Sequence, residues 1–457
     1  MKKLFLIFGI SFLLFYPSLS TFFTNDDFFL LKISQLGSLS SFLHFFDFTK
    51  GPEGLGFYRP LTTQVFYFLG WVFKLNPLPL HIISFVTFFA VTYLVYRLAS
   101  ELSKNQFVAF ISAFLYATSA THFGHLYYLA TYQELGLTLF YLLSTLLFIK
   151  ERYFWSLGFF VLALLSKETA VVLPLTHFLL LWYSGHTKKI KSLLPFSGIL
   201  GVYLYLHTFH YGFASGDSYI WSFSPIKTVN TLFWYILWSL NLPEMLVDFV
   251  GPGFKFNPNL FKFWGNQIKP IFVLFVSQLV LLFYFLFQVK IKKLKSVLVF
   301  GSLWFFITLL PVLFLPLHKF TFYLTLPLFG FVLSLAYLLN LVKSKFLVFL
   351  FLFIFLILSV LTLRLTYETH WITRGAQTAK NVYGFFEESK EDFIGKTVYF
   401  YDTSADTDLS WSPTAALKVV LSDNNFFEVF YNGGIRAIFS EGSGEVVSLK
   451  SRQFLGY

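Results

Sequence analysis

Long apolar runs recur along the first 365 residues of the chain, and short clusters of basic residues separate them. The runs are continuous rather than alternating, so they predict membrane-spanning helices and exclude a β-barrel. If every basic cluster faces the cytoplasm, the runs cross the membrane in pairs, with the N-terminus inside and the C-terminus outside. This parity predicts eleven spans, at residues 4–22, 79–97, 106–121, 133–149, 153–166, 169–184, 192–209, 270–289, 296–316, 320–342 and 346–365.

Some of these runs depart from a simple span. The runs 153–166 and 169–184 are shorter than the roughly 20 residues that a span needs, and they meet at residues 166–168, which predicts a tight helical hairpin. A further run, 229–247, would break the parity if it crossed. We therefore expect it to lie at the outer interface or to re-enter the membrane from the outer side.

The N-terminal apolar run allows two interpretations. Lys2-Lys3 followed by a short apolar core also fits a cleaved signal peptide. No small-x-small cleavage site stands out in the segment from Tyr16 to Ser20, however. The sequence therefore favours a first helix that is retained in the mature protein.

Composition agrees with a chain buried in lipid. Hydrophobic residues make up 56% of the 457 residues, charged residues only 12%, and the mean hydropathy is +0.67. A soluble domain carries about a quarter of its residues as Asp, Glu, Lys and Arg, so this chain cannot coat a water-exposed surface of its size. The expected fold class is an all-α polytopic integral membrane protein. The absence of Cys excludes disulfides and thiolate metal sites.

The net charge of +11 does not indicate nucleic-acid binding, because of where the charges lie. Residues 1–365 hold 26 Lys/Arg and 11 Asp/Glu, whereas residues 366–457 hold 8 and 12. The basic excess therefore belongs to the membrane part, as the positive-inside pattern requires. Most of it falls in short clusters, at Lys2-Lys3, Arg97/Lys104, Lys150/Arg152, Lys188/Lys189/Lys191, Lys290/Lys292/Lys293/Lys295 and Lys343/Lys345.

The chain divides near residue 366, where the hydropathy falls and acidic residues appear. Residues 1–365 form the predicted multi-span domain, and residues 366–457 form a small extracytoplasmic α/β domain. Four short apolar segments of this tail, separated by turn residues, are predicted strands. They are Thr397–Tyr401, Lys418–Leu421, Phe426–Phe430 and Ala437–Phe439.

Most residues with chemical potential map to the outer side. The strongest feature is Asn25-Asp26-Asp27, directly after the first span. Two adjacent carboxylates repel each other, so one can have a raised pKa and act as a base while its neighbour binds a cation. The alternative is a helix N-cap with a solvated partner.

Three cations at outer helix ends are candidates for binding an anionic group. Arg59 offers two parallel hydrogen bonds to a phosphate, and Lys319 stands beside His318. The alternative for both is an ordinary snorkelling side chain. Lys167 stands beside Glu168 at the apex of the predicted hairpin, where the two can simply neutralise each other.

Other sites are weakly indicated or excluded. The pairs His122/His125 and His207/His210 have a spacing that puts both rings on one helix face, but no third ligand completes a zinc site, so interface hydrogen bonds are favoured. The sequence contains no P-loop, no GxGxxG after a strand and no GxSxG. Nothing therefore indicates ATP, NAD or a serine nucleophile.

Taken in order, these residues resemble the GT-C superfamily of polytopic glycosyltransferases, which draw sugar from a polyprenyl-phosphate donor. The nearest likeness is to the protein mannosyltransferase-like branch that includes the TMTC-type proteins, over about residues 1–375. The resemblance rests on Asn25-Asp26-Asp27, Tyr58-Arg59-Pro60-Leu61, Asn76-Pro77 with His81, Tyr132-Gln133-Glu134-Leu135, Ser166-Lys167-Glu168 with Pro174, His318-Lys319 through Tyr323, and Leu326-Pro327.

The chain also departs from that branch. Its members often have Arg-Tyr where Lys319-Phe320 stands, and an Arg before the Glu where Gln133 stands. Tetratricopeptide repeats, which the TMTC-type members carry, are absent. The tail instead resembles the small extracytoplasmic ends of bacterial relatives, which implies a bacterial plasma membrane.

The resemblance implies an inverting glycosyltransferase that transfers a sugar to an acceptor hydroxyl on the extracytoplasmic face. It implies Asp26 as the general base, with Asp27 orienting the acceptor or holding a divalent cation, Mg²⁺ or Mn²⁺, together with Asp26. The acceptor can be a protein, a lipid or a glycan, and membrane lipids are the surroundings. The donor phosphate is assigned to Arg59, Lys167 and Lys319, with support from Tyr58, Glu134, Glu168, His318 and Arg374.

Two other classes of function compete with this interpretation. A transporter or flippase, moving lipid-linked sugars or another solute, predicts charged residues near mid-bilayer and discontinuous helices in paired halves. Here the predicted spans are almost free of charge at mid-depth. A non-catalytic scaffold that presents the tail would leave Asp26 and Asp27 dispensable.

Overall fold

The computed structural model describes residues 2–48, 56–212, 216, 218–251, 255–288, 296–406, 411–440 and 447–456. The basic cluster from Lys290 to Lys295 lies outside the described residues. The first 369 residues are mostly helical, as the apolar runs predict. Their helices are α1 (Lys2–Phe15), α2 (Asp26–Ile33), α3 (Leu39–His44), α4 (Phe66–Val72), α5 (Pro77–Ser103), α6 (Gln106–Ala117), α7 (Phe123–Tyr127), α8 (Tyr132–Ile149), α9 (Tyr153–Leu164), α10 (Leu173–Ser184), α11 (Leu194–Leu206), α12 (Pro225–Ser239), α13 (Leu246–Phe249), α14 (Pro258–Gln288), α15 (Val297–Leu313), α16 (Pro327–Leu341) and α17 (Lys345–Thr369).

Within the described residues, five helical stretches are long and apolar enough to cross a membrane. They are Pro77–Ser103, Leu129–Ile149, Thr187–Tyr211, Pro258–Gln288 and Lys345–Thr369. A sixth arises if Gln106–Ala117 and Ala120–Tyr127, which are bent by 47° at their break, form one span. Shorter apolar helices cover Leu4–Ser20, Tyr153–Leu164, Val297–Leu313 and Pro327–Leu341. The helical, membrane-compatible architecture is therefore confirmed, and the number of eleven spans stays a prediction.

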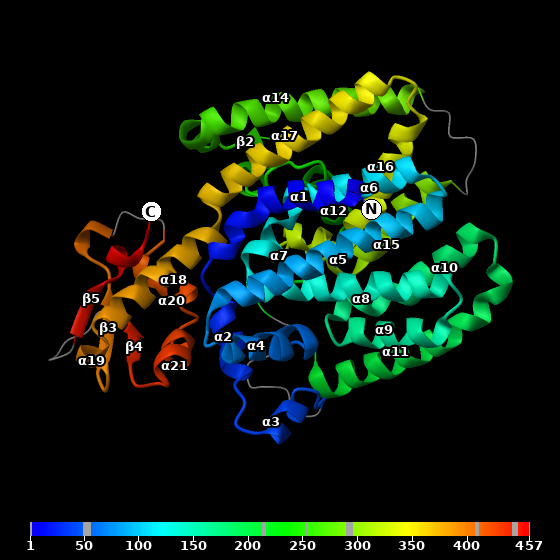
Figure 1. Cartoon of the computed structure of the whole chain (residues 1–457). Helices are drawn as coiled ribbons and strands as arrows, with labels where there is room; N and C mark the ends of the chain where they lie inside the picture. The colour runs from blue at the N-terminus through cyan, green and yellow to red at the C-terminus, as the bar shows by residue number, and fades with distance from the viewer. Residues whose placement is uncertain are drawn as a thin grey trace.

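The helices lie side by side along one direction (Figure 1). Helix α1 starts within the bundle and runs toward the end at which the C-terminal region sits. Helices α14 and α17 pack together along one edge, and α9 and α11 lie along the opposite one (Figure 1). The two termini are thus separated along the bundle.

Local sequence signals set the helix ends. Asn76 caps α5 through its side chain, which accepts from the backbone N–H of Leu78 at 3.0 Å, and Pro77 follows as the first helical residue. Lys104 ends α5 in the left-handed conformation, and Asn105 then caps α6. Only these two residues separate α5 from α6, so the two helices form a tight hairpin.

The interior of the bundle depends on close helix contacts. Helices α15 and α16 meet at Gly301 and Gly330, where an added Cβ would lie about 2.5 Å from backbone atoms of the facing helix. Such approach brings many apolar atoms into contact without any side chain between the backbones. Either glycine is therefore hard to replace by a larger residue.

The stretch 229–247 is not one continuous helix. It is helical to Ser239 and then turns at Asn241, which has a positive φ of 66°. The buried side chain of Asn241 accepts from the backbone N–H of Ala120 at 2.8 Å and donates to the carbonyl oxygen of Phe355 at 3.2 Å. These hydrogen bonds join three segments of the chain. An interfacial or re-entrant path for 229–247 stays a prediction.

The C-terminal region contains a small parallel sheet of order β4-β3-β5, formed by Thr397–Tyr401 (β3), Arg436–Phe439 (β4) and Val447–Lys450 (β5). The sheet is accompanied by α18 (Trp371–Glu388), α19 (Lys390–Phe393), α20 (Pro413–Val420) and α21 (Asn425–Tyr431). A second, two-stranded hairpin joins Val250–Gly251 (β1) to Lys255–Phe256 (β2) in the first part of the chain.

Two of the four strand predictions for this region are correct and two are wrong. Residues 397–401 and 437–439 are strands, whereas 418–421 and 426–430 fall mainly in α20 and α21. Short apolar runs do not distinguish a buried strand from one face of a short helix. Helix signals flank both runs, since Ser412 caps α20 and Asn432 ends α21 in the left-handed conformation.

Candidate functional site

Arg59 is held in a bidentate ion pair inside the protein. Its Nε donates to Oε2 of Glu168 at 2.7 Å, and its Nη2 contacts the second carboxylate oxygen. Its Nη1 donates to Oε1 of Gln133 at 2.5 Å. The guanidinium also lies 3.9 Å from the ring centre of Phe57, and only 7% of the residue is exposed. Arg59 is therefore not a snorkelling surface side chain.

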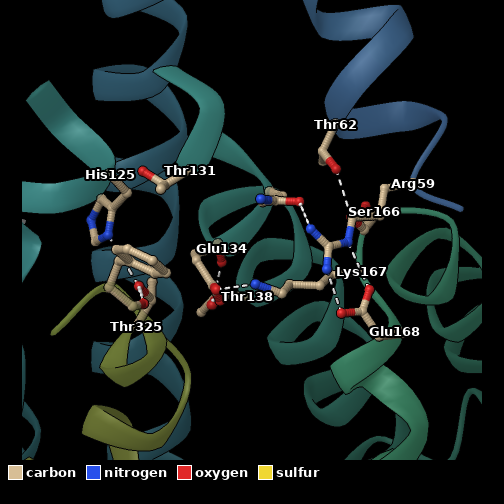
Figure 2. Close-up of polar contacts among 12 residues, drawn as sticks. Arg59, Thr62, His125, Thr131, Glu134, Thr138, Ser166, Lys167, Glu168 and Thr325 are labelled. Carbon is tan, nitrogen blue, oxygen red and sulfur yellow. Dashed lines mark hydrogen bonds and ion pairs between the residues drawn. The ribbon is translucent and has the colours of Figure 1, made fainter. Parts of the chain in front are cut away.

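Lys167 forms a second, deeper ion pair. Its Nζ contacts Oε1 of Glu134, and only 2% of each of the two residues is exposed. The ammonium also lies 4.6 Å from the ring centre of Tyr323. Lys167 and its neighbour Glu168 thus pair with residues on other elements rather than with each other, as Figure 2 shows.

A hydrogen bond from a side chain to the backbone fixes the segment that carries Arg59 against the turn that carries Lys167. The hydroxyl of Thr62 donates to the carbonyl oxygen of Ser166 at 2.6 Å (Figure 2). Gly136 of α8 lets Thr62 approach closely, because a Cβ added at Gly136 would lie 2.5 Å from the methyl group of Thr62. A single turn of π-helix, Leu61–Val65, directs Arg59 into the site.

The four charges of this site compensate each other. Burial acts to raise the pKa of Glu168, but the charge of Arg59 and the hydrogen bonds from its guanidinium outweigh it and lower the pKa to about 2. The guanidinium pKa of Arg59 is raised for the reciprocal reason: burial opposes its charge and Glu168 favours it more strongly. An anion that enters this site would therefore not meet two unpaired positive charges. It would bind to those N–H groups of Arg59 and Lys167 that are not already bound to carboxylates.

An apolar cavity of about 410 Å³ opens directly beside these pairs. Glu168 and Tyr323 of the charged cluster contribute to its wall. The remainder is mainly apolar and aromatic, including Tyr203, Tyr219 and Phe314. This combination suits a ligand with a long apolar part and a polar end.

His318 lies against the same cluster. Its ring centre is 4.1 Å from that of Tyr219, and its buried Nδ1 has no hydrogen-bond partner among the described residues. Burial, together with the charges of Lys167 and Arg59, lowers its pKa to about 4. His318 is therefore a neutral imidazole with an unused nitrogen beside the cations.

The two adjacent aspartates have different surroundings. Asp27 is buried: its Oδ2 accepts from the backbone N–H of Thr24 at 2.9 Å, and its Oδ1 accepts from the hydroxyl of Tyr67. Burial raises the pKa of Asp27 to about 7, against the opposing effect of these hydrogen bonds. Asp26 is reached by solvent, yet it is crowded by protein, and this loss of hydration raises its pKa as well. Asp26 is thus the aspartate that a ligand can contact.

Tyr219 connects the aspartate side of the site to the cation side. Its phenol is within electrostatic reach of Asp26, Arg59 and Glu168, and it interacts with Tyr323. Asp26 is fixed from the other side, because its backbone N–H donates to the hydroxyl of Tyr128 at 3.1 Å. Tyr219, which lines the apolar cavity, is therefore close enough to both Asp26 and Arg59 to be affected by their charges.

The remaining predicted site residues are placed as follows. Tyr58 donates its hydroxyl to the carbonyl oxygen of Phe46 at 2.9 Å, away from any ligand position. Lys319 faces Asp248 and lines two cavities to which neither Arg59 nor Lys167 contributes. Arg374 donates to the carbonyl oxygen of Glu368 at 3.2 Å. The structure therefore brings Arg59, Lys167, Glu134, Glu168 and His318 together, and does not bring Lys319 or Arg374 to them.

The His pair at 122 and 125 is used within the protein interior. Nδ1 of His122 lies 3.1 Å from Nε2 of His125, whose Nδ1 lies 3.0 Å from the hydroxyl of Thr325. This agrees with the hydrogen-bonding interpretation rather than with zinc. Among the residues that the structure describes, no three His, Cys, Asp or Glu side chains are grouped to hold a metal ion, so a divalent cation at Asp26 and Asp27 stays a prediction.

Sequence reasoning missed several partners of the site. Tyr67, Tyr219 and the pairing role of Gln133 come from elements that are distant in sequence from the residues they contact. Aromatic residues make up 22% of this chain, so an individual Tyr carries no signal of its own. Neither models of known protein families nor curated protein sequences match this chain, so its function is argued from the site itself.

Proposed function

We propose that this protein is an integral membrane glycosyltransferase that moves a sugar from a polyprenyl-phosphate donor to an acceptor hydroxyl on the extracytoplasmic face. The observation that carries the proposal is the position of Asp26. It is a solvent-accessible carboxylate with a raised pKa, and it shares Tyr219 with a buried cation cluster that borders an apolar cavity. A candidate base, Asp26, is thus linked through Tyr219 to a candidate anion-binding cluster and to an apolar cavity.

The cavity of about 410 Å³ has room for the part of the polyprenyl chain that is next to the phosphate. A polyprenyl chain gains free energy by leaving water for such apolar walls. Its phosphate then lies beside Arg59 and Lys167, whose remaining N–H groups are donors. Glu134 and Glu168 keep these donors in place and keep the site neutral before the donor arrives.

The chemical step requires one base and stabilisation of one leaving group. Asp26 takes the proton of the acceptor hydroxyl as its oxygen attacks the anomeric carbon. The new oxygen–carbon bond forms as the bond from that carbon to the phosphate oxygen breaks, and the electron pair leaves with the phosphate. A single displacement inverts the anomeric centre. Arg59 and Lys167 stabilise the charge that develops on the phosphate.

His318 and Asp27 have supporting roles in this proposal. The free Nδ1 of His318 lies near the cations and can accept a hydrogen bond from the sugar or the phosphate monoanion. Asp27 holds the turn before α2 through Thr24 and Tyr67, and so fixes the direction in which Asp26 points. A divalent cation would have to bind through Asp26, because both oxygens of Asp27 already accept hydrogen bonds, and the step above does not require one.

The proposal is tested by the release of free polyprenyl phosphate. Purified protein is incubated with a panel of polyprenyl-phosphate sugars and crude envelope acceptors, and the released lipid phosphate is quantified. We expect release that depends on both donor and acceptor. If no donor is consumed, and a lipid-linked sugar instead crosses a reconstituted bilayer that contains the protein, the transporter alternative replaces this proposal.

A further inference from the structure

Two adjoining cavities lie on the far side of the loop that carries His318 and Lys319. The first, of about 660 Å³, has an almost entirely apolar wall that includes Trp234, Phe272 and Phe275 from α12 and α14. The second, of about 550 Å³, has a polar wall that includes Glu244, Asp248 and His370. Neither contains Arg59, Lys167 or Glu168, so they are separate from the proposed donor site.

Lys319 lies where the two cavities meet. It lines both of them, together with Val247 and Pro316. The ammonium is half-buried and faces Asp248. An apolar groove that becomes polar at a lysine matches the order of groups in a phospholipid, in which the chains are followed by a phosphate and then a head group.

The second cavity has the groups that bind hydroxyls. Glu244 accepts from the backbone N–H of Thr321 at 2.7 Å and lies 3.5 Å from Nε2 of His370. Burial acts to raise the pKa of Glu244, but His370 and Thr321 outweigh it, so the pKa is lowered and the carboxylate stays ionised. Trp371, 40% exposed, adds an aromatic face to the same wall. Carboxylates beside an exposed aromatic ring suit a polyol, whose hydroxyls donate and whose C–H faces stack.

This second cavity is also connected to Asp26. The ring of Trp371 packs edge-on against that of Tyr128 at 5.2 Å, and the hydroxyl of Tyr128 accepts from the backbone N–H of Asp26. Two side chains thus separate the polar cavity from the proposed base.

We infer that the two cavities bind a membrane phospholipid with a polyol head group. Its chains occupy the apolar cavity, its phosphate pairs with Lys319, and its polyol lies between Glu244 and Trp371. The head group lies two side chains away from Asp26, so this lipid is placed as a bound lipid beside the proposed site and not as the acceptor.

Lipid retention by the purified full chain tests the inference without any turnover. Native mass spectrometry is performed with phosphatidylinositol, phosphatidylglycerol or phosphatidylcholine added separately. We expect the two polyol lipids to be retained about tenfold or more better than phosphatidylcholine, which has no hydroxyls on its head group. Equal retention of all three lipids would overturn the inference.

Matched variants locate the site. Lys319→Gln and Val247→Trp, which remove the cation and obstruct the junction, should each lower retention of phosphatidylinositol about tenfold. Lys269→Gln and Val229→Trp make the same changes at exposed positions outside both cavities and should bind as the unaltered protein does. Undiminished binding in Val247→Trp contradicts the site.

A competing lipid separates this site from the donor site. Added polyprenyl phosphate should bind alongside phosphatidylinositol and give a ternary mass. It should also bind to Val247→Trp, which no longer retains phosphatidylinositol, and this binding shows that the variant is folded. Displacement of phosphatidylinositol by polyprenyl phosphate would make this groove the donor site and end the inference.

Discussion

The backbone N–H of Asn25 donates a hydrogen bond to the carbonyl oxygen of Val420 at 2.8 Å. This contact joins the turn before Asp26 to the last residue of α20, almost 400 positions later in the chain. Phe28 and Phe426 pack edge-on at 5.2 Å beside it, and Lys32 pairs with Glu428. The C-terminal region therefore supports the aspartate turn directly, which explains how a tail without a recognisable motif can affect the site.

Close packing at Gly375 makes this support testable. A Cβ at Gly375 would lie 2.7 Å from the hydroxyl oxygen of Thr24 and 3.2 Å from Oδ1 of Asn25. Gly375→Ala should therefore displace the aspartate turn and slow transfer, with a cost of about 1–3 kcal/mol in stability. Gly384→Ala, on the same helix but with no atom within 4 Å of its added Cβ, is the control. Turnover assays compare the two variants, and we expect the lower rate in Gly375→Ala. Equal rates would show that the tail does not position Asp26.

The ion pair of Arg59 and Glu168 should be sensitive to the loss of either partner. Glu168→Gln leaves a buried guanidinium without its carboxylate, and we expect a loss of about 3 kcal/mol in unfolding free energy. The double variant Arg59→Gln with Glu168→Gln should recover part of this loss, because no charge is left unpaired. Thermal unfolding in detergent measures both. Strictly additive losses would show that the pair contributes no coupling.

Arg59 should also matter for the donor in a way that its stability role does not predict. Arg59→Lys keeps the charge but removes the bidentate geometry. We expect binding of polyprenyl phosphate to weaken about tenfold. The comparison is Arg97→Lys, at a partly buried arginine near the end of α5 that lies outside the site. Unchanged lipid affinity in Arg59→Lys would remove the residue from the donor site.

Stability should depend on pH through Asp27. Burial raises the pKa of Asp27 from 3.8 to about 7, so the folded protein holds a proton there that the unfolded chain has lost. The resulting contribution to stability is present below the unfolded pKa and is lost as the pH rises through about 7. The unfolding free energy of the unaltered protein, relative to that of Asp27→Asn, should therefore fall between about pH 4 and pH 8. A flat or rising difference contradicts the shift.

The sequence indicated the helical architecture because long apolar runs and basic clusters are signals that each segment carries by itself. Arg59, Lys167 and the acids near them could be recognised as outer polar residues in the same way. Their partners could not, since Arg59 and Glu168 are 109 residues apart and only packing decides which carboxylate meets which cation. The alternative in which Lys167 and Glu168 neutralise each other is wrong for this reason.

Short elements were the least predictable part. The segments around Lys418 and Phe426 are rich in β-branched or aromatic residues, yet they form helices that pack against α2 and α18. Tertiary contacts outweigh local propensity over so few residues. Lys319 illustrates the same limit for function: its neighbour His318 lies beside Lys167 and Arg59, whereas Lys319 lies beside Asp248 and lines two other cavities.

The most direct measurement is donor consumption by Asp26→Asn. The variant keeps the shape of the residue and its backbone hydrogen bond to Tyr128, but it cannot accept the acceptor proton. We predict that it binds polyprenyl phosphate as the unaltered protein does and releases none from a polyprenyl-phosphate sugar, whereas Asp392→Asn, at an exposed position of α19, remains active. Release of polyprenyl phosphate by Asp26→Asn at the rate of the unaltered protein would contradict the role of Asp26 as the base.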